Sequence, residues 1–412
     1  MSTDRFFSSP HTIRRLHEGP LGGYIDDYAQ RLQQQGYSRQ FSRDQIRSVA
    51  DLSHWLQRKR LGIDGIDPPR LVRYLRYRKR QGRSQHCDSL ALDKLLGLLR
   101  ERGIVEDEAV PIISGPRQRV LERFEQYLLA ERGLCPATLL NYIPFVSQLL
   151  SERFGEDRIR FVALRAPDIT GFVQRHAYQM SPGRVRLMVT ALRGFLRYLR
   201  HCGEITMDLA ACVPAVASWS RSTLPKFLPP SQVQRVLDGC DRGTVTGRRD
   251  YAILLLLARL GLRAGEVAAL RLEDIDWAAG QFTVRAKGGR WTELPLPPDV
   301  GAAIAGYLQG RPRCASRRLF IRAHAPRIGF TNASGVCTLV KHALARAGVD
   351  SAHKGAHLFR HSLATQMLRE GASLAEIGEL LRHRHPNTTT IYAKVDVAAL
   401  RALALPWPGE RP

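Results

Sequence analysis

Four short stretches of the chain concentrate residue types that bind anions, move protons and supply an oxygen nucleophile. The first two are GLRAGE, which contains Arg263, and AKGGR, which contains Lys287. The third, HLFRH, places an arginine between histidines, and the fourth, LRHRHPNTTTIY, ends in a single tyrosine. Guanidinium groups fork onto anionic oxygens, imidazoles act as general acids and bases, and a phenolic oxygen can form a covalent intermediate. These stretches are the part of the sequence that carries chemistry.

The composition points to a polyanionic partner. Lys and Arg number 62 against 38 Asp and Glu in 412 residues, which gives a formal net charge of +24. A positive field attracts polyanions over a distance and neutralised phosphates release counterions, so DNA or RNA is the simplest partner. An arginine-rich, high-GC genome would raise the charge without any such function, and this alternative stays open.

The cysteines and the apolar runs of the sequence indicate the cellular compartment of the protein. The seven cysteines are scattered, with no CxxC pair, which argues against a zinc ribbon or a disulfide framework and for a reducing compartment. The N-terminal stretch MSTDRFFSSPHTIRR lacks the apolar core of a signal peptide. The longest apolar run, YAILLLLA, is too short to span a bilayer and predicts a buried helix. We therefore expect no membrane association and a cytoplasmic place beside the bacterial nucleoid.

The elements that precede the four stretches are predicted to be helical. Apolar residues recur at three- and four-residue spacing, and landmarks such as Gly36 and Gly133, or Gly103 and Gly203, recur at offsets of 97 to 100 residues. We interpret this segment as two helical domains, 1–110 and 115–212. The first is a duplicated core-binding-like or arm-binding module that binds DNA, or alternatively a protein-contact module.

A change of composition marks the next boundary. The proline-rich segment 213–230 predicts a linker, and residues 231–412 a further domain. Capping boxes at Ser231 and Ser373 predict helix starts, and Gly261 predicts a left-handed helix stop. The alternating stretch from Leu272 to Pro297 contains two turns and predicts three antiparallel strands.

Taken in order, the four stretches resemble the motifs of the tyrosine recombinase, or phage integrase, family. Those motifs are G-L-R-x-x-E, a lysine on a β-hairpin, H-x-L-R-H and L-G-H-x-x-x-x-T-T-x-x-Y. The resemblance covers about residues 115–405. It implies a mainly α, multidomain fold, in which α-helical N-terminal DNA-binding domains precede an α+β catalytic domain with a small three-stranded antiparallel sheet.

The resemblance also implies a reaction at a DNA phosphodiester. Tyr392 would attack the phosphorus and form a 3′-phosphotyrosyl link, so bond energy is kept and neither ATP nor a metal is needed. Arg263 and Arg360 would hold the non-bridging oxygens, which gather negative charge in the transition state. The family's second histidine corresponds to His383, which precedes Tyr392 by nine residues, and not to His385.

The remaining motif residues would move protons or support the site. Lys287 would protonate the leaving 5′-oxygen, although a Lys-Gly-Gly turn is common on any hairpin. His357 would take the tyrosine proton and return it in the reverse reaction, and His383 would hydrogen-bond a phosphoryl oxygen. Glu266 is expected to orient an arginine or cap a helix, and His361 to have a supporting role.

Arg382 departs from the family pattern, which usually has glycine immediately before this histidine. Glycine would allow an unusual φ, so arginine predicts an ordinary helical backbone at this position. We expect its guanidinium to contact phosphate instead.

The implied partners are a double-stranded DNA recombination site and a synaptic homo-tetramer on that DNA. The tail VDVAALRALALPW carries an apolar stripe that predicts a C-terminal helix docking on a neighbouring protomer, with packing on its own catalytic domain as the alternative. The expected function is site-specific recombination for integration, excision or transposition of a mobile element.

Two other classes of function stay open on the sequence alone. One is a catalytically inactive DNA-binding accessory factor that keeps the fold. The other is a metal-dependent nuclease, because His357 and His361 have i, i+4 spacing and the HRH stretch contains ligand types. No acidic ligand stands beside these histidines in the sequence, and we expect no metal or other cofactor.

Overall fold

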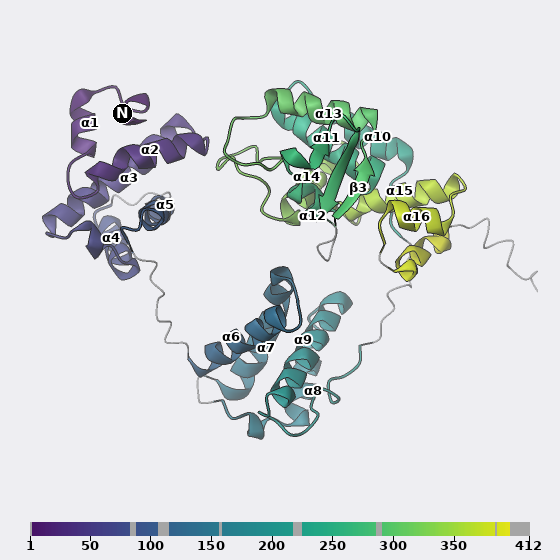
Figure 1. Cartoon of the computed structure of the whole chain (residues 1–412). Coiled ribbons are helices and arrows are strands. Elements are labelled where there is room, and N and C mark those ends of the chain that lie inside the picture. The colour runs from purple at the N-terminus through teal and green to yellow at the C-terminus, as the bar shows by residue number, and fades with distance from the viewer. Residues whose placement is uncertain are drawn as a thin grey trace, which may run out of the picture. The chain divides into compact units, whose positions relative to one another are not determined.

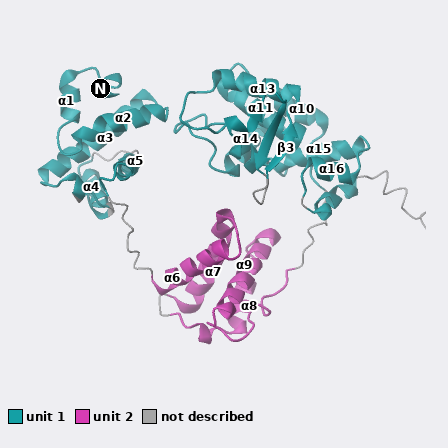
Figure 2. Ribbon diagram, in the orientation of Figure 1, with its two compact units in different colours: residues 1–106, 223–412 teal, residues 107–222 magenta. Residues whose placement is uncertain are grey.

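The structure is a computed structural model that describes residues 2–82, 88–105, 115–155, 159–216, 225–285, 291–383 and 385–395. Two compact units are distinguished, residues 107–222 and residues 1–106 together with 223–412 (Figure 2). The buried apolar side chains of the N-terminal segment, of the 107–222 unit and of the C-terminal segment form separate clusters.

The N-terminal segment is a group of helices around one apolar core (Figure 1). Tyr28, Trp55 and Leu95 are buried in this core, and the Tyr28 hydroxyl donates to Gln45. Ser38 and Asp67 cap the helices that follow them with their side-chain oxygens. The elements are η1 (Ser2–Arg5), α1 (Pro10–Leu16), η2 (Gly22–Tyr24), α2 (Ile25–Gln34), α3 (Arg39–Arg58), η3 (Ile63–Gly65), α4 (Pro68–Arg80) and α5 (Asp88–Glu101).

The 107–222 unit has a second helical core, rich in aromatic rings. Phe124 and Phe195 meet edge to face at 5.1 Å between ring centroids, a favourable geometry for two rings. Prolines at the first turns suit these helix starts, because the missing N–H would have no partner there. The elements are α6 (Pro116–Ala130), α7 (Pro136–Phe154), η4 (Phe161–Ala163), α8 (Ala166–Ala177) and α9 (Pro182–His201).

The order of elements from α2 to α5 recurs from α6 to α9, with η3 and η4 at the same place in each series. The glycines paired by the sequence offsets share a left-handed backbone. Gly36 and Gly133 have φ of +74° and +59°, and Gly103 and Gly203 have φ of +67° and +72°. This likeness supports the predicted duplication, which stays a prediction.

The C-terminal segment combines helices with a small sheet. The predicted linker ends at α10 (Pro230–Asp238), and the capping box expected at Ser231 is wrong, because Pro230 already occupies the first turn. The remaining elements are α11 (Val245–Leu260), α12 (Ala264–Ala269), η5 (Leu272–Asp274), β1 (Ile275–Asp276), β2 (Gln281–Arg285), β3 (Trp291–Pro295), α13 (Pro298–Gly310), α14 (Ala333–Arg346), α15 (His357–Arg369), α16 (Leu374–Leu380) and η6 (Pro386–Val395).

The described strands form the predicted three-stranded antiparallel sheet in the order β1-β2-β3. Phe282 pairs with Ile275 on one side and with Leu294 on the other, and all three side chains are buried. The turn before β2 contains Gly280 at φ +65°, whereas the second predicted turn, with Lys287, lies outside the described residues. The predicted fold class, mainly α with a small antiparallel sheet, is confirmed.

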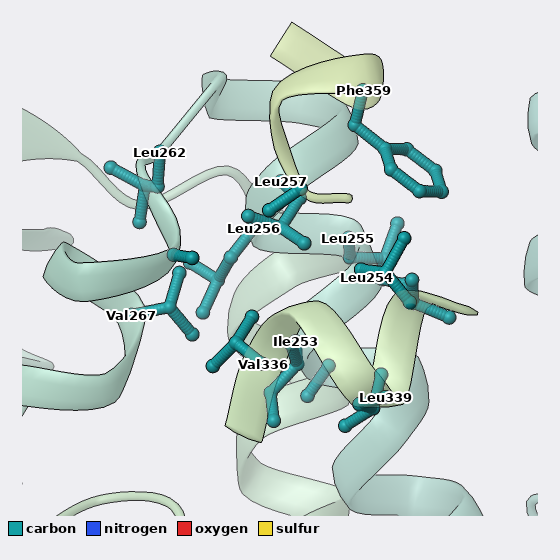
Figure 3. Close-up of a cluster of buried hydrophobic side chains, with 14 of the residues drawn as sticks. Ile253, Leu254, Leu255, Leu256, Leu257, Leu262, Val267, Val336, Leu339 and Phe359 are labelled. Carbon is teal, nitrogen blue, oxygen red and sulfur yellow. The ribbon is translucent and has the colours of Figure 1, made fainter. Parts of the chain in front are cut away.

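Helix α11 is the centre of the C-terminal core. Its residues from Ile253 to Leu257 are all buried, as expected for a helix that is apolar on every face. Figure 3 shows side chains of α12, α14 and α15 gathered around it, among them Val267, Leu339 and Phe359. Within the described part of the chain, no helix is long and apolar enough to cross a membrane.

Candidate active site

Arg263 is held where helix α11 stops and α12 begins. Gly261 ends α11 in the predicted left-handed conformation, with φ of +56°, and Arg263 is the N-cap residue of α12. Glu266 reaches back to this residue twice. Its carboxylate accepts the main-chain N–H of Arg263 at 2.8 Å and Arg263 Nη1 at 2.7 Å. Glu266 therefore both caps the helix and orients the arginine.

Arg360 comes from the first turn of α15 and is 3% exposed. Its guanidinium donates to the carbonyl oxygens of Gly261 and Leu381, which lie in different parts of the chain. Burial, and then the positive charges of Arg263 and Arg382, lower the pKa of Arg360 to about 10. The group still carries its charge at neutral pH, inside a cluster that already holds excess positive charge.

Tyr392 lies in η6 and is almost completely buried, at 1% exposure. Its ring packs against Ala364, Ile377 and Leu381. A hydrogen bond of 2.9 Å joins Tyr392 Oη to Nδ1 of His361, one turn along α15 from His357. Burial raises the pKa of Tyr392 to about 12 against the opposing effect of the Arg360 charge, so the phenol is protonated at neutral pH.

Both histidines of the HLFRH stretch are neutral at physiological pH. Burial, followed by the charges of Arg360 and Arg263, lowers the pKa of His357. Burial, followed by His357 and Arg360, lowers the pKa of His361 to about 4. A neutral imidazole has a free ring nitrogen that can accept a proton. His361, which the sequence assigned a supporting role, is the histidine bonded to the tyrosine.

His383 lies at the end of α16 in the sequence order that its motif predicts. A 2.7 Å hydrogen bond joins its Nδ1 to Oγ1 of Thr389, which is buried. Burial, and then the charges of Arg360 and Arg263, lower the pKa of His383 to about 4. His383 therefore lies close enough to both arginines to be affected by their charge.

The prediction for Arg382 is wrong in its backbone. Its φ is +53°, in the left-handed region that glycine favours, and not in the helical region. The helix α16 ends two residues earlier, so Arg382 lies in the turn that follows the helix and not in the helix itself. The side chain bends inward, and Nη2 donates to Oε2 of Glu266 at 3.1 Å. The sequence offered no signal for this contact, which spans 116 residues.

The structure therefore brings together Arg263, Arg360, His361, His383 and Tyr392, with His357 and Glu266 beside them. Lys287 and the predicted C-terminal docking helix lie outside the described residues. In the described ranges, no group of three or more His, Cys, Asp or Glu side chains is placed to hold a metal ion. The arrangement is a positively charged cluster beside a protonated phenol and neutral imidazoles.

Comparison with solved structures identifies the fold. The chain resembles XerH site-specific recombinase bound to a palindromic difH substrate, with a TM-score of 0.54 and 18% identity over 69% of this chain and 83% of that one. It also resembles a lambda integrase dimer bound to a COC′ core site, with a TM-score of 0.52 and 16% identity over 74% and 86% of the two chains. The fold is thus that of the DNA integrases and recombinases.

Sequence comparison identifies the family. The profile described as "Phage integrase family" matches residues 226–398. An integrase/recombinase of Sinorhizobium fredii, y4rA, is 47% identical over 98% of this chain and 99% of its own. Tyrosine recombinase XerC of Shewanella amazonensis is 33% identical over 67% and 91%. The chain belongs to the phage integrase family of tyrosine recombinases, enzymes of site-specific DNA recombination.

Proposed function

We propose that the chain cuts and rejoins DNA at a specific site through a 3′-phosphotyrosyl intermediate formed by Tyr392. The observation that supports this most is one cluster of two arginines and three neutral histidines, in which His361 is bonded to the Tyr392 phenol and the Arg360 charge acts on it. Attack of Tyr392 Oη forms a bond to phosphorus and breaks the bond to the 5′-oxygen, which leaves as a hydroxyl. A second 5′-hydroxyl reverses the step, so no external energy source is consumed.

The proton path follows from the neutral imidazoles. His361 holds the Tyr392 hydroxyl before DNA binds, and His357 accepts its proton during the attack, because a neutral ring has a free lone pair. Arg263 and Arg360 stabilise the charge on the non-bridging oxygens. His383 hydrogen-bonds one of these oxygens, and Lys287 protonates the leaving 5′-oxygen.

Burial of the nucleophile adds a step before the chemistry. At 1% exposure, the phenol cannot reach a DNA phosphate from its described position. Segment η6 therefore has to shift when DNA binds, and the 2.9 Å bond to His361 has to break or turn with it. Attack then requires the reacting oxygen within about 3–3.5 Å of phosphorus.

The partners we propose are a double-stranded recombination site and three further copies of the chain. Solved structures with a similar fold include XerH bound to difH and a lambda integrase tetramer bound to a Holliday junction. The relative y4rA is named as an integrase/recombinase, which supports a role in integration, excision or transposition of a mobile element. Its match covers 98% of this chain, so the additional N-terminal helices are shared with it.

The experiment starts from a pool of duplexes with randomised sequence, each nicked close to the randomised region. A cut beside a nick releases a short strand, so rejoining fails and the covalent complex accumulates. DNA that stays attached to protein after denaturation is recovered and sequenced, which yields the site. The selected duplex, again nicked, then serves as the probe for every variant below.

Tyr392→Phe is expected to abolish the covalent complex and leave DNA affinity nearly unchanged, because only one hydroxyl is lost. Tyr307→Phe is the matched control: this tyrosine is also 1% exposed, and among the described residues its hydroxyl accepts one hydrogen bond, from the main-chain N–H of Ile321. Electrophoresis after denaturation separates free from attached DNA. Specific binding without any adduct in the wild type would instead favour the inactive accessory factor.

A further inference from the structure

Arg382 occupies a backbone conformation that an L-residue rarely adopts. Its φ is +53°, and among the described residues other than glycine only Arg60 shares a positive φ. In the left-handed region the Cβ atom crowds the following carbonyl, so a side chain there is strained. Glycine would remove the strain, yet the chain has arginine. The strain has to be offset by interactions in the folded structure.

The guanidinium of Arg382 is 5% exposed and faces Glu266, whose side chain is 4% exposed. Nη2 donates to Glu266 Oε2 at 3.1 Å, and Nη1 donates to the carbonyl oxygen of Leu380 at 3.1 Å. Within the described residues Nε has no acceptor. The side chain therefore points into the site and not toward solvent, where the expected phosphate contact would lie.

Glu266 is shared between two arginines. Its Oε1 accepts Arg263 Nη1 at 2.7 Å, while Oε2 accepts both the Arg263 main-chain N–H and Arg382 Nη2. The geometry of Arg263 thus depends on a carboxylate whose other side is fixed by Arg382. Fixing one carboxylate oxygen from the far side limits how the Glu266 side chain can rotate.

The charges explain why a second arginine is useful here. A buried Glu266 paired with Arg263 alone would cancel the positive charge that Arg263 presents to a phosphate. Arg382 adds one positive charge behind the carboxylate, so Glu266 can orient Arg263 while the group as a whole stays cationic. Breaking a buried pair by removing one partner leaves an uncompensated charge, so Glu266 would then draw Arg263 toward itself.

We propose that Arg382 is a positioning residue for the reaction: through Glu266 it fixes Arg263 and preserves the positive charge that Arg263 presents to the scissile phosphate. The proposal rests on the function proposed above and assigns a role to the residue that replaces the family's glycine. It replaces the earlier expectation of a direct phosphate contact.

The test measures single-turnover formation of the covalent complex on the nicked duplex, with DNA affinity and thermal midpoint measured on the same proteins. Arg382→Gly relaxes the backbone and removes the guanidinium. We expect a lower thermal midpoint, because the lost buried pair outweighs the relief of backbone strain, with an unchanged dissociation constant. Cleavage by the folded variant should be slower by about tenfold or more, as for loss of a charged hydrogen bond. Arg382→Lys keeps the charge and is expected to recover part of the rate.

A double-mutant cycle separates action through Glu266 from action on DNA. We expect Glu266→Gln to slow cleavage, and Arg382→Gly to add little to the effect of Glu266→Gln, because both changes disrupt the same pair. Multiplying effects, or a weakened DNA affinity of Arg382→Gly alone, would mean direct DNA contact and overturn the proposal. Arg60→Gly is the matched control, since it removes an exposed arginine of φ +55° far along the sequence, and its cleavage rate should equal that of the wild type.

The outcomes distinguish the two proposals. If the wild-type protein forms no covalent complex, the proposed function fails and this inference fails with it. If the wild type forms the complex and Arg382→Gly matches its rate, only the positioning role is wrong. If the glycine variant unfolds, Arg382→Lys and the cycle built on it are the test. A full wild-type rate for the lysine variant would contradict a role that needs both donors of the guanidinium, Nη2 to Glu266 and Nη1 to Leu380.

Discussion

His361 and His383 differ from ordinary histidines in the pH at which they gain a proton. Burial is the main cause for both, and the positive charge of Arg360 adds to it. Their pKa values of about 4 lie below the usual value of 6.5, so the folded chain resists protonation that the unfolded chain accepts. The unfolded state therefore binds more protons between these values, and folding stability has to fall as the pH falls.

The first prediction follows from this fall in folding stability at low pH. As the pH is lowered from about 6.5 to about 4, the stability of the C-terminal segment falls by on the order of 1 kcal/mol per histidine, after allowance for partial exposure. A His361→Gln variant should lose less stability over the same interval. Thermal midpoints at several pH values measure the effect, and NMR of ¹³C-labelled histidine reports each titration directly. Titration of both rings near pH 6.5 would contradict the predicted environment.

At the residue scale the sequence indicated which motif residues would lie together, but it did not indicate the contacts between them. The spacing to Tyr392 predicted His383, and the motifs predicted Arg263 and Arg360, as members of the site. The bond between His361 and Tyr392 could not be predicted, because it depends on how η6 folds back onto α15 across 31 residues. The left-handed backbone of Arg382 was missed because the usual signal for it, a glycine, is absent at this position, while α16 ends two residues earlier.

At the scale of elements, the end of helix α11 sets the position of the site. A Cβ atom on Gly261 would lie 2.6 Å from Cδ2 of Leu381, which is buried, and 3.7 Å from Cγ of Arg360. Gly348 follows α14 with a similar φ of +61°, but a Cβ atom there would meet nothing within 4 Å. An alanine at Gly348 would therefore be strained only in its backbone, whereas an alanine at Gly261 would be strained and would also clash with its neighbours.

We predict that Gly348→Ala destabilises the protein by about 1–2 kcal/mol, the cost of a left-handed alanine. Gly261→Ala is expected to cost about 1–3 kcal/mol more, because the core has to shift around the added methyl group. It should also slow formation of the covalent complex, whereas Gly348→Ala should not. Thermal or denaturant unfolding with the cleavage assay measures both; equal effects of the two substitutions would contradict the clash.

Helix α4 presents a basic face on the N-terminal segment. Arg73, Arg76, Lys79 and Arg80 are exposed, and their spacing places Arg73, Arg76 and Arg80 on one side of the helix. The ion pairs found among the described residues involve none of them. We predict that this face contacts DNA phosphates.

Replacing Arg73, Arg76 and Arg80 together by alanine should weaken DNA binding. The slope of log affinity against log salt concentration should become less steep by as much as about three. The control replaces Arg31, Arg47 and Arg102 by alanine, which removes the same amount of positive charge. These three arginines already pair with Glu101, Asp44 and Asp27. Binding of the full chain to a short duplex is measured over a salt series. If both triple variants give the same slope, α4 has no special role.

Element types were easier to predict than element boundaries. The capping box at Ser373 is present, with its hydroxyl accepting the Glu376 N–H, and Gly261 is the predicted helix stop. At Ser231 the same signal failed, because two prolines before it start the helix earlier. Periodicity indicates that a helix exists, but competing start signals decide where it begins.

At the scale of the whole molecule, the proposed chemistry assigns to arginine the work that a metal does in many nucleases. We therefore predict that covalent complex formation is unchanged within about twofold after treatment with EDTA, because two fixed guanidinium groups already stabilise the transition-state charge. The adduct on the selected duplex is quantified with and without the chelator. Activity that disappears with EDTA and returns with a divalent cation would instead favour the metal-dependent nuclease.

The division of the molecule was predictable in outline because each segment has to bury its own apolar stripe. The helical periodicity of the first 210 or so residues and the single alternating stretch that follows correspond to the described helices and sheet. The number and order of domains, and the partner of the C-terminal stripe, stay predictions. An apolar stripe indicates that an apolar surface covers it. The stripe in the C-terminal tail fits a surface of a second protomer as well as a surface of its own chain.

The anchoring of Arg360 bears on how this site tolerates change over generations. Both acceptors of its guanidinium are main-chain oxygens, of Gly261 and Leu381. Every amino acid supplies such an oxygen, so no replacement at these two positions can delete an acceptor, and only a distortion of the backbone can displace it. A change of side chain therefore leaves both acceptors of Arg360 in place for as long as the path of the backbone is kept.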